Sequence, residues 1–381
     1  MTDLEHILPL WYELETSGVD YVLATVVTVE GSSYRRPGAR MLLAQDGRRA
    51  GTVSGGCLEA EVAKRAWWLS SNGPLVERYS TLEDDGDLPY GSGCGGVVYI
   101  LLERRKTASP LLHALKSAWN VRKPLAIATV LEGSLIGHRA FAMPGVPLGD
   151  DDVRASDSKF ELQSLSEIAL DRRTSIDQKV SIDGVPTRVW VDYRSARPGL
   201  WIFGAGDDAK PLLRLARELG WFVAIADGRS HLATLNRFAA ADEVRALKID
   251  DLPGRERLQL LTTDAAVLMT HSFEQDSHIL AALMVGDEQE LPYAYVGVLG
   301  PQRRTREALA QAARLRHITA DADRIEGWLA QVHAPTGIDL GADTSASIAL
   351  SILAEIQQTL NAATALPLRQ VRATKVAVAQ S

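Results

Sequence analysis

The sequence contains very little cysteine: Cys57 and Cys94 are the only two among 381 residues. Two cysteines cannot form the disulfide framework of a small secreted protein. They are not arranged as a CxxC pair and no paired histidine motif accompanies them, so they make a poor zinc site. Free thiols fit the reducing cytoplasm, where we expect this protein to reside.

Long apolar runs and an excess of positive charge are absent too. No stretch approaches the roughly 18 apolar residues that span a bilayer, and the acidic start at residues 1–6 lacks the features of a secretory signal. The 41 basic and 48 acidic residues give a net charge of −7. This balance excludes a broad electrostatic surface for nucleic acid or anionic lipid but leaves room for a local basic pocket. We therefore expect no nucleic-acid partner and no membrane association.

The pattern of predicted elements changes near residues 194–199, and this change predicts two domains. Before it, short strands and helices mix, so residues 1–193 are predicted to form an N-terminal α/β cofactor-binding domain. After it, strands alternate with helices, which is typical of a Rossmann-like, doubly wound parallel sheet over residues 199–360. Residues 361–381 are weakly patterned and are predicted to be a tail. The expected fold class is therefore α/β.

The first candidate site is a glycine-rich turn that ends at Cys57, at the predicted start of a helix. The helix dipole there favours the thiolate, glycines let the backbone approach a ligand, and arginines on the preceding loop could supply positive charge. This pattern favours an anion pocket with a reactive sulfur; the alternative is a buried cysteine beneath a turn. Glu59 is interpreted only as a favourable acid in the first helical turn. The candidate residues are Arg35, Arg36, Ser54, Gly55, Gly56 and Cys57.

A second glycine-rich segment, residues 91–96, surrounds Cys94 ahead of a predicted strand over residues 97–102. It again places bare backbone amides beside a thiol. If the two glycine-rich segments adjoin, both sulfurs line one cleft, and Cys94 becomes a further candidate for cofactor binding. The alternative is a tight turn without a ligand.

The third candidate site has the layout of a dinucleotide-binding fingerprint. Gly204 and Gly206 lie between a predicted strand and a predicted helix, and Asp227 follows 21 residues after Gly206 at the end of the next strand. However, Asp207 and Asp208 place two negative charges where a pyrophosphate would meet the helix N-terminus. We therefore expect the Rossmann-like fold without tight NAD(P) binding.

A polar segment over residues 270–276 follows the predicted strand 265–269. Because the carboxyl ends of strands line the ligand crevice of an open α/β sheet, His271 is a candidate ligand-binding residue there. The alternative is an ordinary capped helix start. From these residues alone, the competing functions are an NAD(P)-dependent oxidoreductase that uses Gly204–Asp227 and a non-catalytic nucleotide-sensing module.

Several motifs together resemble the XdhC/CoxI family. In the first half of the chain they are the loop over residues 31–41, the turn over residues 51–59 and the segment Gly93–Gly96. In the second half they are residues 201–206, 227–229, 270–276, 333–342 and 351–356. The resemblance covers most of residues 20–358, with its motifs in the order that the family has.

The resemblance implies a maturation factor for xanthine dehydrogenase and related molybdenum hydroxylases, without turnover of its own. Members of the family bind the molybdenum cofactor, a molybdopterin that is either free or a dinucleotide. They promote exchange of an oxo ligand for a terminal sulfide and deliver the cofactor to the apo-molybdoenzyme. A cysteine desulfurase is the sulfur-donating partner, and a homodimer is expected. By the motif match, Cys57 is the residue that the family ties to cofactor binding.

A first prediction concerns the thiol of Cys57. The substitution Cys57→Ser keeps the size of the side chain but removes the soft sulfur and its easily ionised proton. We expect the variant to fold normally and to lose most of its bound cofactor, measured as molybdenum and pterin in the purified protein. Retention of cofactor at the wild-type level would refute this role of Cys57.

Overall fold

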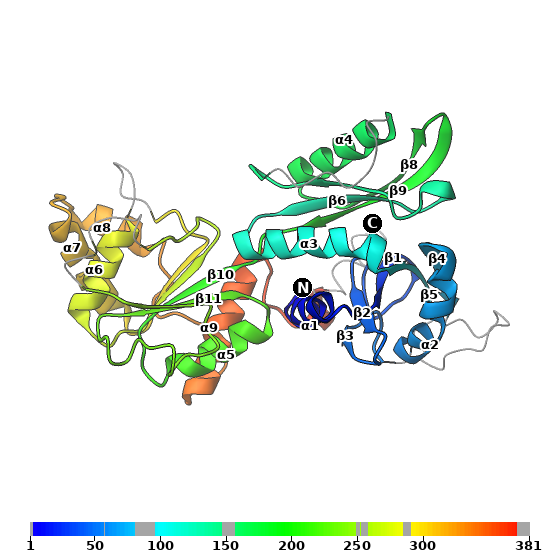
Figure 1. Cartoon of the computed structure of the whole chain (residues 1–381). Helices are drawn as coiled ribbons and strands as arrows, with labels where there is room; N and C mark the ends of the chain where they lie inside the picture. Colours follow the sequence, from blue (N-terminus) through cyan, green and yellow to red (C-terminus); the bar gives the residue numbers. More distant parts are fainter. Residues whose placement is uncertain are drawn as a thin grey trace. The chain divides into compact units, whose positions relative to one another are not determined.

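The computed structural model describes residues 3–56, 58–80, 96–146, 157–248, 252, 258–284 and 291–371, with the backbone alone for residues 157–159. The chain divides into two compact units, Met1–Arg197 and Pro198–Ser381. Figure 1 follows the chain through both of them. The cysteines Cys57 and Cys94 lie outside the described residues.

The first unit contains two antiparallel sheets. One has the strand order β3-β2-β1-β5-β4, and the other has the order β7-β6-β9-β8. In chain order, the helices and strands are α1 (Leu4–Ser17), β1 (Tyr21–Gly31), β2 (Arg40–Ala44), β3 (Arg49–Gly51), α2 (Glu59–Leu69), β4 (Leu75–Ser80), β5 (Gly96–Arg104), α3 (Arg105–Val121), β6 (Leu125–Val130), β7 (Arg139–Ala142), α4 (Asp157–Arg172), β8 (Ile176–Ile182) and β9 (Val185–Arg194).

Helices cover both faces of the five-stranded sheet. Side chains alternate between the two faces along a strand, and in β1 Tyr21 and Leu23 pack with α1 and α3, whereas Val22 and Ala24 pack with α2. The helix α1 buries one apolar stripe and ends at Gly18, which adopts φ 71°. This left-handed residue allows the chain to turn directly into β1.

The four-stranded sheet also has two different faces. Val189 and Val191 of β9 pack in the cluster beneath α4. Trp190, on the opposite face of β9, packs against Val27 and Leu101 of the five-stranded sheet. The same alternation brings Asp192 to the side of β9 that faces the five-stranded sheet.

Buried ion pairs connect the two sheets of the first unit. The guanidinium of Arg40 in β2 lies 2.7 Å from the carboxylate of Asp192, and their side chains are only 2% and 4% exposed. Arg194 donates a second hydrogen bond to the same carboxylate at 2.9 Å. Burial lowers the pKa of Arg40 to about 10, and the charge of Asp192 opposes that shift. A second buried pair joins Glu103 of β5 to Arg139 of β7.

The second unit is built on one parallel sheet with the strand order β12-β11-β10-β13-β14. Its elements in chain order are β10 (Gly199–Phe203), α5 (Ala209–Glu218), β11 (Phe222–Asp227), β12 (Glu243–Ala246), β13 (Ala265–Leu268), α6 (Phe273–Leu283), β14 (Tyr295–Val298), α7 (Gln302–Leu315), α8 (Ala322–Leu329) and α9 (Ser345–Leu360). This confirms the expected Rossmann-like, doubly wound sheet in the second half of the chain.

Alternate residues of the central strand β10 pack into two separate hydrophobic cores, one on each face of the sheet. Trp201 and Phe203 pack beneath α6, α7 and α8, and Leu200 and Ile202 pack beneath α5 and α9. Figure 1 shows these two helical layers on either side of β10 and β11. A strand that is apolar on both faces is typical of a parallel sheet buried between helices.

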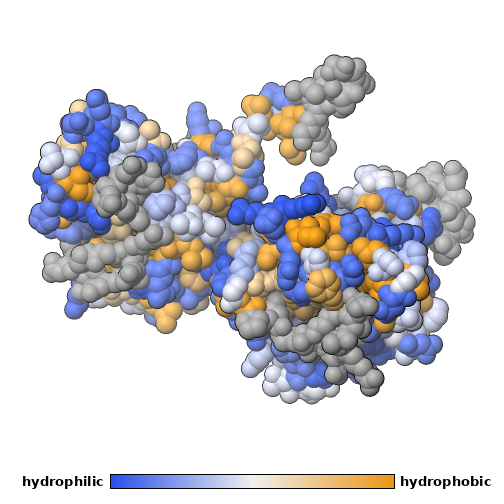
Figure 2. Space-filling model, turned by 90° about the horizontal axis from the view of Figure 1, so that it is seen from above, coloured by the Kyte–Doolittle hydropathy of each residue, from blue (hydrophilic) through white to orange (hydrophobic). Residues whose placement is uncertain are grey.

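The molecular surface is mixed in character. On the face that Figure 2 shows, hydrophilic side chains are interspersed with hydrophobic ones, as on ordinary globular proteins. None of the helices in the described ranges combines the length and the apolar composition that crossing a bilayer requires.

A second prediction tests the buried ion pair between the sheets. The substitution Asp192→Asn leaves the guanidinium of Arg40 buried without a counter-charge, so we expect a loss of about 3–5 kcal/mol of stability. Urea denaturation at pH 7 measures this loss. The matched control is Asp177→Asn, because Asp177 is 38% exposed in its pair with Arg188 and should contribute less than about 1 kcal/mol. Equal effects of the two substitutions would contradict the prediction.

Candidate functional site

The turn between β3 and α2 is organised around the carboxylate of Glu59. This side chain is 5% exposed and accepts hydrogen bonds from the amides of Val53 at 3.2 Å, Ser54 at 2.8 Å and Gly56 at 3.0 Å. The hydroxyl of Ser54 donates to its second oxygen at 2.6 Å. A carboxylate from the first turn of α2 therefore fills the concave side of the glycine-rich turn.

The environment of Glu59 keeps it ionised. Burial alone would raise the pKa of the carboxyl, but the hydrogen bonds from Ser54 and Gly56 outweigh burial and lower the pKa below its ordinary value of 4.5. Hydrogen bonds that are made only to the ionised form have this effect because they stabilise the charge.

Both residues that flank position 57 are anchored. The amide of Gly56 donates to Glu59, and the amide of Leu58 donates to the hydroxyl of Ser54 at 3.2 Å. Cys57 itself, between these two residues in the sequence, lies outside the described residues.

The sequence pattern predicted that the glycines of this turn let the backbone approach a ligand. In the structure the backbone amides of Ser54 and Gly56 donate to Glu59. Glu59 was interpreted as a helix-terminal acid only, and its contact with the turn was missed. The sequence does contain a signal for this contact: Glu59 follows Ser54 by five residues, and the two glycines between them allow the chain to turn back.

The two arginines of the loop after β1 have different environments. Arg35 forms an ion pair with Asp3, whose carboxylate also accepts the amide of Thr52 at 3.2 Å. Arg36 is exposed. Arg35 therefore holds the loop against the segment that leads into the glycine-rich turn. Of the two predicted anion ligands, Arg36 is the more exposed, since Arg35 is only partly exposed.

The loop after β1 lies between the two glycine motifs. An ideal Cβ placed on Gly55 would lie 3.3 Å from the ring of Tyr34. A Cβ placed on Gly96 would lie within 2.1 Å of the carbonyl oxygen of Ser32, so that only glycine permits this approach. Gly55 and Gly96 therefore both lie against the loop after β1, while the segment around Cys94 ahead of Gly96 lies outside the described residues.

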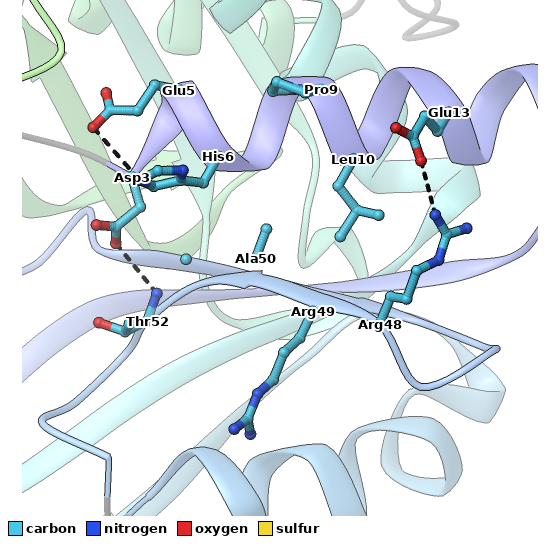
Figure 3. A pocket seen from close by; sticks show the side chains of 11 residues that line it. Asp3, Glu5, His6, Pro9, Leu10, Glu13, Arg48, Arg49, Ala50 and Thr52 are labelled. Atoms are coloured by element: carbon cyan, nitrogen blue, oxygen red, sulfur yellow. Dashed lines mark hydrogen bonds and ion pairs between the residues drawn. The ribbon is translucent and has the colours of Figure 1, made fainter. Parts of the chain in front are cut away.

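A groove of about 880 Å³ runs between α1 and β3 on the same unit (Figure 3). Glu13 pairs with Arg48 across it at 2.8 Å, and in Figure 3 the side chain of Arg49 extends away from it. Burial raises the pKa of Glu5, although a backbone hydrogen bond and His6 act in the opposite direction. Carboxylates and arginines both line the groove, so its charges nearly balance. It is lined by Asp3, Glu5, His6, Pro9, Leu10, Glu13, Arg48, Arg49, Ala50, Gly51 and Thr52.

In the second unit, the loops after β10 and β13 meet at the point where the strand order reverses. A Cβ on Gly204 would lie 2.4 Å from the carbonyl oxygen of Met269, so these loops touch. The carboxylate of Asp208 lies over Gly206 and 2.8 Å from the Nε2 atom of His271. This contact occupies the place where a Rossmann sheet ordinarily receives a pyrophosphate.

Asp227, which the fingerprint predicted to bind a ribose, makes its hydrogen bonds within the protein. Asp227 is 1% exposed and accepts the amide of Ala205 at 2.7 Å and two guanidinium nitrogens of Arg229 at 2.7 and 3.0 Å. Burial would raise the pKa of Asp227, but the hydrogen bonds from Arg229 and Ala205 lower it. In the described structure Asp227 therefore stabilises the glycine loop from within.

Comparison with known proteins establishes the family of this chain. Residues 14–80 match the XdhC and CoxI family, and residues 200–356 match the XdhC Rossmann domain. A Bacillus subtilis protein, named as a probable subunit of xanthine dehydrogenase, is 30% identical over 348 residues, which are 89% of this chain and 92% of the relative. The chain belongs to the XdhC/CoxI family.

Two further XdhC/CoxI relatives match over most of their length. The Escherichia coli protein named "Molybdenum cofactor insertion chaperone PaoD" is 25% identical over 93% of this chain and 88% of its own. A crystal structure from Bacillus halodurans, described as a xanthine dehydrogenase, has a TM-score of 0.70 and 26% identity, and the match covers 95% and 96% of the two chains.

The family motifs over residues 333–342 and 351–356 stabilise the packing of the Rossmann domain. The hydroxyl of Tyr295 lies 2.5 Å from both Thr336 and Glu355, and Glu355 also accepts the amide of Gly337 at 2.7 Å and contacts His333 at 3.1 Å. Burial and the carboxylate of Glu355 raise the pKa of Tyr295. This cluster attaches α9 and the segment after α8 to β14.

A third prediction tests the carboxylate that organises the turn. Glu59→Gln removes charge-assisted hydrogen bonds, so we expect a loss of about 1.5–3 kcal/mol at pH 7. Because the pKa of Glu59 is lowered in the folded state, this contribution is complete above pH 4.5 and disappears as the pH falls through the lower folded value. Urea denaturation of both proteins between pH 3 and pH 7 measures the difference.

The matched control for this experiment is Glu61→Gln in the same helix turn. Glu61 lies 3.9 Å from Arg65 and is 25% exposed, so its loss should cost less than about 1 kcal/mol. A difference between wild type and Glu59→Gln that stays constant across this pH range would show that the ionised carboxylate does not stabilise the turn.

Proposed function

We propose that this protein is a chaperone that binds the molybdenum cofactor, promotes its sulfuration and inserts it into a xanthine dehydrogenase-type apo-enzyme. The observation that carries the proposal is the full-length similarity to an insertion chaperone for this cofactor, together with similarity to a protein named as a probable xanthine dehydrogenase subunit. The cofactor would therefore be the cargo of this protein, and it would be carried either as molybdopterin or as the molybdopterin dinucleotide.

Cargo binding would take place at the turn before α2. Cys57 would lie near the metal or dithiolene, where a thiolate is a soft ligand. Arg36 would pair with the phosphate, because Arg35 is already paired with Asp3 and the amides of Ser54 and Gly56 donate to Glu59. Cys94 would contribute from the second glycine-rich segment of the sequence.

The chaperone would work with two partner proteins in the cytoplasm. The apo-molybdoenzyme receives the cargo, a cysteine desulfurase supplies the sulfur, and the chaperone acts as a homodimer in the cytoplasm. The protein would have no turnover of its own, because purine hydroxylation needs an electron path away from molybdenum. The two cysteines of this chain cannot ligate even one four-cysteine iron–sulfur cluster.

The competing function is an NAD(P)-dependent oxidoreductase built on Gly204–Asp227. Against it stand the carboxylate of Asp208 over Gly206 and the commitment of Asp227 to Arg229 and Ala205. In the chaperone proposal the Rossmann domain instead supplies an interface or a second contact to the cargo through the loops of Gly204, Gly206 and His271, while Asp227 supports the first of these loops from within.

A fourth prediction is the direct test of the chaperone. The protein purified from cells grown with molybdate should carry molybdenum and pterin, and that from cells grown without molybdate should not. Mixed with an apo-molybdoenzyme, a cofactor source and a sulfur donor, it should accelerate the appearance of xanthine or aldehyde oxidation by the client. Robust oxidation by this chain alone, or no effect on client maturation and no bound pterin, would reject the proposal.

The competing oxidoreductase is tested by calorimetric titration with NAD(P). We expect a Kd weaker than about 1 mM, or roughly −4 kcal/mol. The double substitution of Asp207→Asn and Asp208→Asn should strengthen any anion binding, because it removes negative charge from the start of α5. Micromolar binding by the wild-type protein would favour the oxidoreductase.

A further inference from the structure

Tyr34 is an exposed aromatic side chain seated on the glycine-rich turn. Its side chain is 72% exposed, yet an ideal Cβ on Gly55 would lie 3.3–3.5 Å from three of its ring atoms. One face of the ring therefore rests on the backbone at Gly55. With so much of the side chain exposed, the opposite face is open to solvent.

The contact with Tyr34 accounts for a glycine at position 55. Its backbone is not in the left-handed region that favours glycine, and the ring of Tyr34 provides the three nearest atoms that a Cβ would meet. The missing side chain thus lets the ring lie flat against the turn, two residues before Cys57 in the sequence.

The neighbouring side chains fix the orientation of this loop. Arg35 is held by Asp3, and the hydroxyl of Ser33 donates to the carbonyl oxygen of Arg35 at 3.0 Å. On either side of the anchored Arg35, Tyr34 and Arg36 are exposed. Within the described residues, the guanidinium of Arg36 has no ion pair, so an aromatic ring and an uncompensated positive charge stand two positions apart.

We propose that the open face of Tyr34 stacks on a planar heteroaromatic ring that carries an anionic group, and that Arg36 pairs with this group. This inference rests on the chaperone proposal, in which the ring is the pterin of the cargo and the anion is its phosphate. An aromatic side chain that stacks on a heterocyclic base contributes about 1–3 kcal/mol in other proteins, and an arginine suits phosphate recognition.

A flat ring fits this surface better than a protein partner. The neighbours of Tyr34 in the loop are Gly31, Ser32, Ser33, Arg35, Arg36 and Pro37, so the sequence places no large aliphatic or second aromatic side chain beside it. Stable protein interfaces need an extended, well-packed area. A single ring with a charged neighbour instead matches the size and chemistry of a pterin phosphate.

The test uses a pterin monophosphate as the probe and follows quenching of its fluorescence by the full-length protein. Tyr34→Phe keeps the ring and should change the Kd by no more than about twofold. Tyr34→Leu still covers Gly55 but cannot stack, so the Kd should rise about tenfold or more, equivalent to about 1.4 kcal/mol. The matched control is Tyr12→Leu, because Tyr12 is 59% exposed on α1 and should leave the Kd unchanged.

The role of Arg36 is tested by comparing a phosphorylated with an unphosphorylated pterin. Arg36→Gln should raise the Kd for the pterin monophosphate about tenfold and reduce its dependence on salt, while binding of an unphosphorylated pterin should be unaffected. Equal loss with both probes would contradict the assignment of Arg36 to the anion.

The outcomes separate this inference from the chaperone proposal. If the wild-type protein binds the probe and Tyr34→Leu binds equally well, stacking on Tyr34 is overturned while the chaperone function stands. Equal losses in Tyr34→Phe and Tyr34→Leu would assign the effect to the hydroxyl and would also overturn stacking. If the wild-type protein binds neither this probe nor the cofactor and matures no client, the chaperone proposal fails and the inference fails with it.

Discussion

The conformation of the turn before α2 depends on one internal anion, the carboxylate of Glu59. Three backbone amides and one hydroxyl donate to it, and an ionised acceptor in such surroundings is stronger than a neutral one. Because this carboxylate occupies the concave side of the turn, an anionic cargo would have to bind on the outer side. Tyr34 and Arg36 are exposed there.

The Rossmann domain follows the same physical rule. Asp227 accepts the amide of Ala205 and the guanidinium of Arg229, and Asp208 lies over Gly206 beside His271. In each domain a carboxylate of the protein accepts a backbone amide of a glycine-rich turn. The Rossmann fold alone therefore does not show that this domain binds a dinucleotide, because fold alone does not decide function.

Local chemistry predicted much of the architecture. The apolar residues of α1 recur at helical spacing in the sequence, and Gly18 ends the helix. The pair Asp183 and Gly184, a typical two-residue hairpin sequence, joins β8 to β9 with positive φ angles at both residues. The alternation of strands and helices predicted the parallel sheet, and the motifs predicted the family. These features were accessible because periodicity and backbone preference act between residues that are close in the sequence.

The partners of the charged residues were decided only by the tertiary structure. Arg35 pairs with Asp3, Asp208 contacts His271 across 63 positions of sequence, and Arg40 meets Asp192 across 152 positions. An arginine or a carboxylate looks the same in a sequence whether it binds a ligand or another side chain. What separates the two cases is burial and the distance to an opposite charge, since both set the electrostatic energy. The sequence by itself determined the elements and the family, whereas the folded chain determined which of its charges remain free for a ligand.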